Sequence, residues 1–375
     1  MIYFDNGASS YPKPQMVRRA VNTWLRNNGA NPGRSGHRMS MDAAEMVFNT
    51  RLALAGFFGV KESDQIILVP SATYALNTVL LGLFEKGDHV ITTELEHNSV
   101  LRPMWFLKKC GIDVTVIAID LSDETKTVDA VMNAVTEKTK AIVCTQCSNV
   151  CGWMMPIRQL VEKKPENIKL IVDGSQGAGV MATNVIADRI DYYCAPSHKG
   201  LLGPQGGGII VLNNSPPRPL VYGGTGTDSM ILEQPTTLPE RLESGTLPGP
   251  ICAGLQAAIS YLDKYGVENV YNHKRRLTEY AYQKLRSVPG IELYMLPYAD
   301  KCNGVIPFNI RGYDSGTISE YLNGRNIYVR GGIHCAPLFH KKMGTQERGM
   351  VRISFGIFNK ESEIDILSDV LKKIR

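Results

Sequence analysis

Apolar runs of strand length alternate with amphipathic segments through the first two-thirds of the chain. Seven such runs lie between residues 14 and 248, and segments with helical periodicity separate most of the earlier ones. Near-continuous apolar strands joined through helices are typical of a parallel sheet that is covered on both faces. The pattern therefore predicts an α/β fold with a mostly parallel seven-stranded sheet, whose strands are residues 65–69, 89–93, 114–119, 141–145, 170–173, 192–195 and 208–212.

Amphipathic periodicity predicts the helices of the same region. Pro14 suits the first turn of a helix that runs to about Arg26, because proline tolerates that position. Residues 28–38 are rich in Gly, Asn and Arg and are expected to form a loop. Further helices are predicted at residues 40–58, 73–84, 100–109, 128–136 and 157–163.

The pattern changes after about residue 250. Two long helical segments are followed by short strands that alternate less cleanly and by a last helix, which is typical of a smaller α+β domain. The predicted helices are 251–265, 270–288 and 360–373, and the strands lie near 291–294, 304–309, 327–330 and 351–355. We therefore expect a large domain of residues 14–248, and a small domain formed by residues 1–13 and 249–375.

Composition narrows the class of protein. The 375 residues carry 41 Lys and Arg against 36 Asp and Glu, a mild excess of 41 − 36 = 5 without long charged runs, so we expect no nucleic-acid and no membrane partner. No long apolar segment and no signal-peptide pattern are present, so a cytoplasmic protein with reduced cysteines is expected. Cys144, Cys147 and Cys151 lack a matching second pair of ligands, and no metal site is predicted.

Two residues that follow apolar runs point to a cofactor. Asp173 ends the run 170–173, and Lys199 follows the run 192–195 in the segment Ala195-Pro196-Ser197-His198-Lys199-Gly200. An amine that can form a Schiff base and an acid that can pair with a pyridinium nitrogen are the protein groups that pyridoxal 5′-phosphate (PLP) needs. A phosphate loop at residues 203–208 is the alternative, but it lacks the Gly-Lys-Ser/Thr ending of ATP-binding loops. The sequence therefore predicts PLP as cofactor.

Other side chains at strand ends complete the predicted cofactor site. Ligands of open parallel sheets bind at the carboxyl ends of the strands, and a helix N-terminus suits a phosphate. His97 is expected to stack on the ring, although a capping or surface histidine is its alternative, and Gln176 is expected to donate to the phenolic oxygen of the ring. The residues predicted to bind the phosphate from this chain are Ala72, Thr73, Ser197 and His198.

Two residues of the C-terminal region are candidates for chemistry on the substrate. Cys335 lies in a Gly- and Pro-marked loop flanked by basic side chains, a setting that favours thiolate, although a buried structural cysteine is the alternative. Arg352 lies inside an apolar strand pattern, where a buried guanidinium needs a partner. That partner is either a substrate carboxylate, held with the help of Arg330, or an internal salt bridge.

These residues resemble the PLP-dependent class V aminotransferase superfamily, of fold type I, nearly from end to end. The segments that carry the resemblance are Tyr3-Phe4-Asp5-Asn6-Gly7-Ala8-Ser9, Glu96-His97-Asn98-Ser99, Ser148-Asn149-Val150-Cys151-Gly152, Val172-Asp173-Gly174-Ser175-Gln176, Ser197-His198-Lys199 with Gly203-Pro204-Gln205-Gly206, and Glu243-Ser244-Gly245-Thr246. The resemblance implies a homodimer in which Thr246 reaches the phosphate of the partner subunit's cofactor. It also implies that Asn149 and Arg352 bind the substrate carboxylate.

The segment Arg330-Gly331-Gly332-Ile333-His334-Cys335-Ala336 is similar to the cysteine loop of the cysteine desulfurase and selenocysteine lyase branch. Gly331 and Ile333 depart from the commonest form, as does Ser71-Ala72-Thr73-Tyr74 at the phosphate site. The resemblance implies that L-cysteine is converted to L-alanine, with Lys199 as base at the α-carbon and Cys335 taking the sulfur as a persulfide. A protein that accepts this sulfur is a further expected partner.

Two other interpretations remain open from the sequence. One is a selenocysteine lyase acting on L-selenocysteine, or an aminotransferase or β-eliminating lyase of the same superfamily, in which Cys335 is not essential. The other is a catalytically silent protein that kept the fold for binding. The presence of Lys199, Asp173 and His97 together argues against the silent protein.

Overall fold

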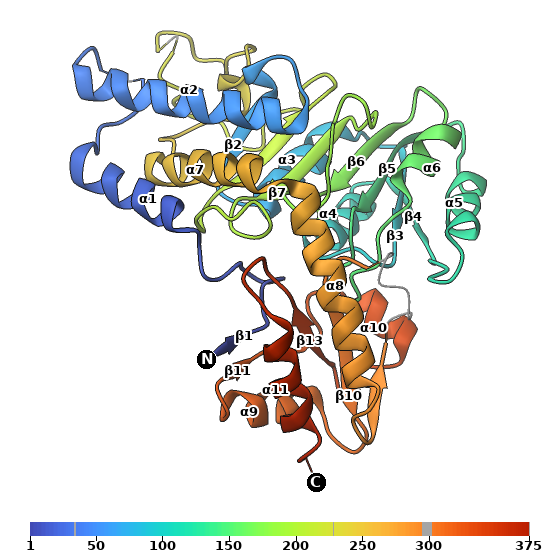
Figure 1. Cartoon of the computed structure of the whole chain (residues 1–375). Coiled ribbons are helices and arrows are strands. Elements are labelled where there is room, and N and C mark those ends of the chain that lie inside the picture. The colour runs from blue at the N-terminus through green and yellow to red at the C-terminus, as the bar shows by residue number, and fades with distance from the viewer. Residues whose placement is uncertain (34, 228, 295–301, 375) are drawn as a thin grey trace.

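The strands of the large sheet are β2 (Ile66–Val69), β3 (His89–Thr93), β4 (Asp113–Ile117), β5 (Thr139–Thr145), β6 (Lys169–Asp173), β7 (Tyr192–Pro196) and β8 (Gly208–Leu212). They lie in the order β2-β8-β7-β6-β5-β3-β4 (Figure 1). The structure is a computed structural model, and it describes residues 1–33, 35–227, 229–294 and 302–374. β8 runs antiparallel to both of its neighbours, and the other adjacent strands are parallel. The predicted mostly parallel seven-stranded sheet is confirmed.

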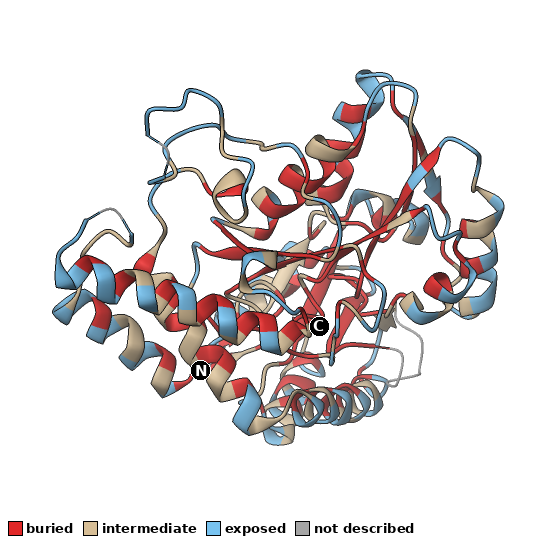
Figure 2. Ribbon diagram, turned by 90° about the horizontal axis from the view of Figure 1, so that it is seen from above, coloured by how far each residue is buried: buried red, intermediate tan, exposed pale blue. Residues whose placement is uncertain are grey.

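Helices cover both faces of this sheet, and alternation along each strand decides which core a residue enters. In β2, Ile66 and Leu68 lie in one hydrophobic core while Ile67 and Val69 lie in the other. The first core also holds side chains of five helices: α1 (Gln15–Asn27), α2 (Arg38–Phe58), α5 (Glu124–Asn133), α6 (Ile157–Lys163) and α7 (Gly249–Tyr265). The second core holds side chains of α3 (Ala72–Leu83) and α4 (Asn98–Lys109). Figure 2 shows that most strand residues are buried, whereas the helices expose one side; the edge strand β4 exposes Asp113 and Val116. This is why the strands read as continuous apolar runs.

The C-terminal part of the chain forms two smaller sheets around a third core. The antiparallel sheet has the order β12 (Arg330–Gly332), β13 (Met350–Ser354), β10 (Val305–Ile310) and β9 (Ile291–Leu293). The other sheet is a parallel pair of β1 (Ile2–Tyr3) and β11 (Ile327–Tyr328). The helices are α8 (Val267–Leu285), α9 (Ser315–Asn323), α10 (Pro337–Met343) and α11 (Glu361–Leu371). The N-terminus therefore lies beside the C-terminal region (Figure 1).

The structure corrects several predicted elements of this region. The single strand expected near residues 327–330 is two strands, since β11 pairs with β1 whereas β12 pairs with β13. The helices α9 and α10, which are 9 and 7 residues long, were not predicted. In the large sheet region, α5 begins at Glu124 instead of residue 128, because Asp123 caps it.

The division into two domains at residue 248 stays a prediction. Helix α7, which that division assigns to the small domain, packs against α1 and α2 and buries Cys252, Leu255 and Ile259 in the first core of the large sheet. Helix α8 continues from it to the third core, where Leu277 and Ala281 are buried. Two short 3₁₀ helices, Ser63–Gln65 and Glu240–Leu242, complete the described elements.

Candidate active site

The carboxyl ends of β2, β3, β5, β6 and β7 meet at one cavity. Parallel strands all end at the same edge of a sheet, so side chains that are far apart in the sequence converge there. The cavity is lined by Ser71, Ala72, Thr73, His97, Ser99, Thr145, Asn149, Asp173, Ser175, Gln176, Pro196, His198 and Lys199. The structure thus brings together most residues that the sequence predicted to bind a cofactor.

Lys199 and Asp173 form the charged part of this cavity. The side chain of Asp173 is buried, and its Oδ1 atom accepts a hydrogen bond of 2.9 Å from the backbone N–H of Ser175. Burial lowers the pKa of the half-buried Lys199 to about 8, and the charge of Asp173 opposes that shift. A lysine with such a pKa is in part a neutral amine near neutral pH, which is the form that attacks an aldehyde.

His97 lies at the junction of β3 and α4, where it is the N-cap of the helix. Its Nδ1 atom accepts a hydrogen bond of 3.0 Å from the backbone N–H of Ser99, so in the neutral ring the proton is on Nε2. Burial lowers the pKa of His97 to about 4, and the ring is therefore neutral at pH 7. The structure shows both the capping role, which was the alternative, and a place on the cavity wall, which ring stacking requires.

Ser99 is a cavity residue that the sequence did not single out. Its hydroxyl lies 2.9 Å from His97 Nδ1 and 2.8 Å from the hydroxyl of Thr73. It thereby connects the first turn of α4 with the first turn of α3, the two helices whose N-termini face the cavity. The position within Glu96-His97-Asn98-Ser99 was the available signal, but the contact with Thr73 is visible only in three dimensions.

The predicted phosphate-binding residues divide into two groups. Ala72, Thr73 and His198 line the cavity, and the Nδ1 atom of His198 is buried without a hydrogen-bond partner among the described residues. Ser197 is not among the lining residues: its hydroxyl donates to the carbonyl oxygens of Pro204 and Gly207, which holds the glycine-rich turn after Lys199. Its position does not favour a phosphate contact, because a hydroxyl whose single hydrogen is engaged by backbone cannot donate elsewhere.

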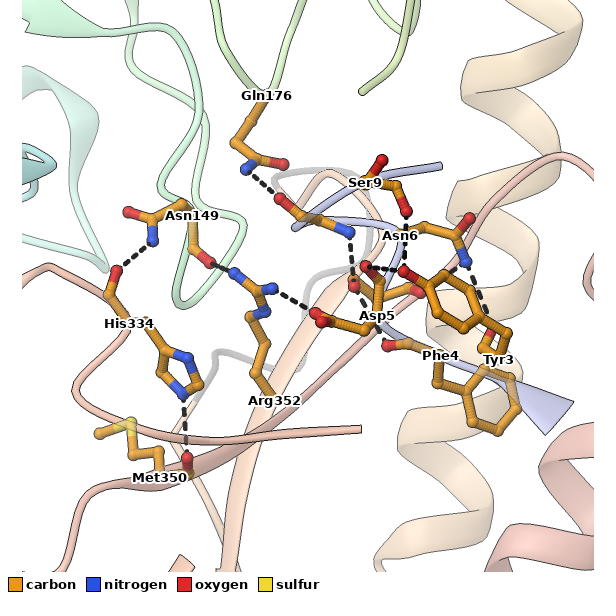
Figure 3. A network of polar contacts seen from close by, with 12 residues as sticks. Tyr3, Phe4, Asp5, Asn6, Ser9, Asn149, Gln176, His334, Met350 and Arg352 are labelled. Carbon is orange, nitrogen blue, oxygen red and sulfur yellow. Dashed lines mark hydrogen bonds and ion pairs between the residues drawn. The ribbon is translucent and has the colours of Figure 1, made fainter. Parts of the chain in front are cut away.

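Gln176 and Asn149 are held by neighbours from distant parts of the chain. The side-chain amide of Gln176 donates to the carbonyl oxygen of Gly7 at 2.9 Å. The side-chain amide of Asn149 donates to the carbonyl oxygen of His334 at 2.7 Å (Figure 3). The two contacts connect the cavity with the N-terminal segment and with the loop of Cys335.

Cys335 lies beside the cavity, on a loop with unusual backbone. His334 and Cys335 have φ angles of 52° and 56°, in the left-handed region that non-glycine residues rarely adopt. The carbonyl oxygen of Cys335 accepts a hydrogen bond of 2.8 Å from the backbone N–H of Asn98, the residue after His97. The side chain is half-buried. The fold thus places the cysteine loop against the helix that begins at His97, although Cys335 is not among the residues that line the cavity.

Arg352 has an internal partner. Its guanidinium is buried, and its Nη2 atom forms an ion pair of 2.6 Å with Asp5 Oδ1. The Nη1 atom donates to the carbonyl oxygen of Asn149 at 3.0 Å, and Nε is buried without a partner among the described residues. The internal salt bridge, one of the two alternatives from the sequence, is therefore present. Arg330 lies opposite Arg352 across the β12–β13 pair.

Thr246 is a second predicted cofactor residue, after Ser197, that does not line this cavity. It is exposed, and it follows Glu243, whose carboxylate forms a buried ion pair with Arg51 of α2. The resemblance assigns Thr246 to the cofactor of a partner subunit, so its place outside this chain's own cavity agrees with that assignment without testing it.

Among the described residues, cysteines and acidic residues form no other candidate centre. Within the described ranges, no group of three or more His, Cys, Asp and Glu side chains is arranged to hold a metal ion. Cys144, Cys147 and Cys151 are buried, and burial raises the pKa of each thiol. None of the helices in the described part of the chain has the length and apolar character needed to cross a membrane.

The residues of the cavity fit PLP. A buried carboxylate, an amine of lowered pKa and a neutral histidine ring all line the cavity, and these are the groups that suit a pyridinium nitrogen, an aldehyde and a ring face. The unpartnered Nδ1 atom of His198 and the N-terminus of α3 provide polar groups for a phosphate. Asp173, Lys199 and His97 would hold the ring, and Thr73 and His198 the phosphate.

Comparison with known proteins identifies the family. The profile of the aminotransferase class-V family matches residues 2–367. This chain belongs to the class-V aminotransferase family. The predicted family and the predicted fold are both confirmed.

Three of the similar proteins are named cysteine desulfurases. A probable cysteine desulfurase of Methanothermobacter thermautotrophicus is 32% identical over 387 residues, which cover 100% of this chain and 94% of that protein. A cysteine desulfurase of Haloferax volcanii is 30% identical, with 100% of this chain and 89% of that protein covered. The structure of a cysteine desulfurase from Thermococcus onnurineus has a TM-score of 0.89 and 29% identity, and covers 99% of this chain and 94% of that one.

Proposed function

We propose that this chain is a PLP-dependent cysteine desulfurase that converts L-cysteine to L-alanine and takes the sulfur on Cys335 as a persulfide. The observation that carries the proposal is that the loop of Cys335 is bonded to the N-terminus of a helix beside the cavity. The cavity of Lys199 and Asp173 suits PLP, and the Cys335 loop is bonded to the first residue of the helix that His97 caps. Family membership and the names of the relatives support the same reaction.

The cavity residues have distinct tasks in this proposal. PLP, when bound, supplies an electron sink for a proton lost from the α-carbon of the substrate. Asp173 would keep the pyridine nitrogen protonated, and the neutral His97 would stack on the ring. Burial lowers the pKa of Lys199 to about 8, so the side chain is available as a neutral amine. In this form Lys199 removes the α-proton.

The sulfur step balances without a further reactant. The thiolate of Cys335 attacks the substrate sulfur, the bond between the substrate Cβ atom and its sulfur breaks, and protons complete the methyl and α-positions of alanine. The sulfur remains as the Cys335 persulfide. Thiolate nucleophilicity falls as thiol pKa falls, so a thiol that titrates near ambient pH serves best.

Arg352 and Asn149 are assigned to the substrate carboxylate, and Arg330 supports them with a second positive charge. The neighbouring cationic side chains and the buried, unpartnered Nε atom of Arg352 suit a carboxylate. We also propose a homodimer in which Thr246 completes the phosphate site of the partner subunit, and a sulfur-acceptor protein that receives the persulfide sulfur.

The proposal is tested by product analysis. The PLP-loaded protein and its Cys335→Ser variant are incubated with L-cysteine and a thiol reductant, and alanine and sulfide are measured. We expect equimolar products from the unmodified protein and none from the variant, while the visible absorbance of the cofactor persists in both. Alanine formation that is indifferent to Cys335 would reject the persulfide, and turnover of L-selenocysteine alone would favour the lyase alternative.

A further inference from the structure

The N-terminal segment is bonded to two residues that line the cavity, Gln176 and His198. Ser9 and Ser10 contact the carbonyl oxygen of His198, Gly7 accepts from Gln176, and the backbone N–H of Gly7 donates to the Ser354 hydroxyl at 2.7 Å. These contacts bind residues 5–10 to the end of β7 on one side and to β13 on the other. Figure 3 shows that Asp5 projects from this segment toward Arg352.

Asp5 supplies the counter-charge that Arg352 needs in the absence of substrate. The Arg352 side chain is 1% exposed, and burial lowers the pKa of its guanidinium whereas Asp5 raises it. Removing one partner of a buried ion pair leaves a costly uncompensated charge. Among the described residues, the Asp5 carboxylate is the only acidic group that forms an ion pair with Arg352.

The side chain of Arg352 is held by more contacts than the side chain of Asp5. Arg352 lies in the middle of β13, with Nη1 bonded to Asn149. The backbone of Asp5 is also fixed, because it bridges to Ser354, but its side chain is 21% exposed. Arg352 is the one partner of the Asp5 carboxylate in the contacts that the structure describes. A rotation of the Asp5 side chain therefore breaks a single ion pair and leaves the strand contacts intact.

We propose that Asp5 is a built-in competitor for the substrate carboxylate, which binds Arg352 by displacing the Asp5 side chain. This inference rests on the proposed function, because it takes Arg352 as the carboxylate-binding residue. A ligand must then bring a carboxylate of its own to replace the lost charge. Asp5 thus lowers the affinity of the site for every carboxylate, and a ligand without a carboxylate leaves the pair of Asp5 and Arg352 in place.

The test measures binding of propionate, a carboxylate without an amino group, to the PLP-loaded protein. Binding is followed through the visible absorbance of the cofactor and through the rise in unfolding temperature with propionate concentration. If the pair with Asp5 occupies about nine-tenths of the free protein, removing it tightens the apparent Kd about tenfold. We therefore expect about tenfold tighter binding in Asp5→Asn and in Asp5→Ser, and binding like that of the unmodified protein in Asp5→Glu.

The matched control is Asp129→Asn, which removes the same charge from an exposed ion pair with Lys163. It should bind propionate like the unmodified protein. Unchanged or weaker binding in both Asp5→Asn and Asp5→Ser would overturn the inference, because Asp5 would then belong to the carboxylate site itself. Arg352→Gln separates the two proposals: if it still binds propionate normally, the assignment of Arg352 fails, while alanine formation tests the desulfurase reaction independently.

Discussion

The backbone N–H of Asn98 donates to the carbonyl oxygen of Cys335 at 2.8 Å, although 236 positions (335 − 98 − 1) separate them in the chain. This bond joins the N-terminus of α4 in the large sheet region to the loop between β12 and α10. His97 precedes Asn98 and lines the cavity. The loop of the candidate nucleophile is therefore bonded to the residue that follows His97, which is predicted to stack on the ring.

Asn149→Ala should loosen the cysteine loop. The substitution leaves the buried carbonyl oxygen of His334 without its 2.7 Å donor, and an unsatisfied buried polar group costs about 1–3 kcal/mol. We expect a lower free energy of unfolding in urea and faster alkylation of Cys335 by iodoacetamide. Asn269→Ala is the control, because its exposed amide also donates to a carbonyl oxygen, that of Tyr265, and should have little effect. Equal effects of the two substitutions would contradict the assigned role.

The left-handed backbone of the loop should make position 334 sensitive to residue shape. Asn tolerates a positive φ angle, whereas a β-branched residue does not, and the left-handed conformation costs about 1–2 kcal/mol per ordinary residue. Both His334→Asn and His334→Val remove the ring bond to the carbonyl oxygen of Met350. We expect His334→Val to be the less stable of the two by about 1 kcal/mol in urea unfolding. Equal stability would mean that the ring contact alone matters.

The lowered pKa of Lys199 predicts how the apoprotein captures PLP. The neutral amine is the reactive form, and its fraction rises with pH until the pH exceeds the pKa. The capture rate should therefore rise up to about pH 8 and then level off. With a lysine of the ordinary pKa of 10.5, the capture rate would continue to rise above pH 8. Stopped-flow absorbance measures this rate against pH.

Asp173→Asn provides the matched test of that profile. Asp173 raises the pKa of Lys199, so its replacement should move the plateau to lower pH, while Asp129→Asn on the surface should leave it unchanged. A capture rate that rises steadily through pH 10 in the unmodified protein would show that Lys199 titrates normally.

The ion pair of Arg51 and Glu243 should be one of the costliest to break. Both side chains are buried, and Glu243 also accepts from the backbone N–H of Leu68. Removal of one partner from a buried pair costs about 3–5 kcal/mol, so Arg51→Met should lower the free energy of unfolding by about that amount. The double variant Arg51→Met, Glu243→Leu should be less destabilised than the sum of the single ones. Arg158→Met, at an exposed pair with Glu162, is the control and should change stability little.

The local pattern of apolar and polar residues was sufficient to predict the large sheet and the polar residues at its strand ends. The seven apolar runs are short and bounded by turn residues, and helices separate most of the earlier ones, so each could be recognised without its neighbours. Because parallel strands end at one edge, Lys199, Asp173 and His97 could be placed together before their distances were known. In the C-terminal region the strands belong to two sheets and the helices are short, and there the periodicity failed to separate β11 from β12.

The sequence by itself determined the class of fold, the cofactor chemistry and the identity of most cavity residues, since these depend on residue type and on position along a strand. Only the tertiary structure decided that Asp5 neutralises Arg352, that Ser99 joins Thr73 to His97, and that the Ser197 hydroxyl donates to backbone carbonyl oxygens. Each of these is a contact between side chains or segments whose meeting depends on how layers and domains pack. No local period encodes such a meeting, because the energy that selects it comes from burial and charge pairing across the whole fold.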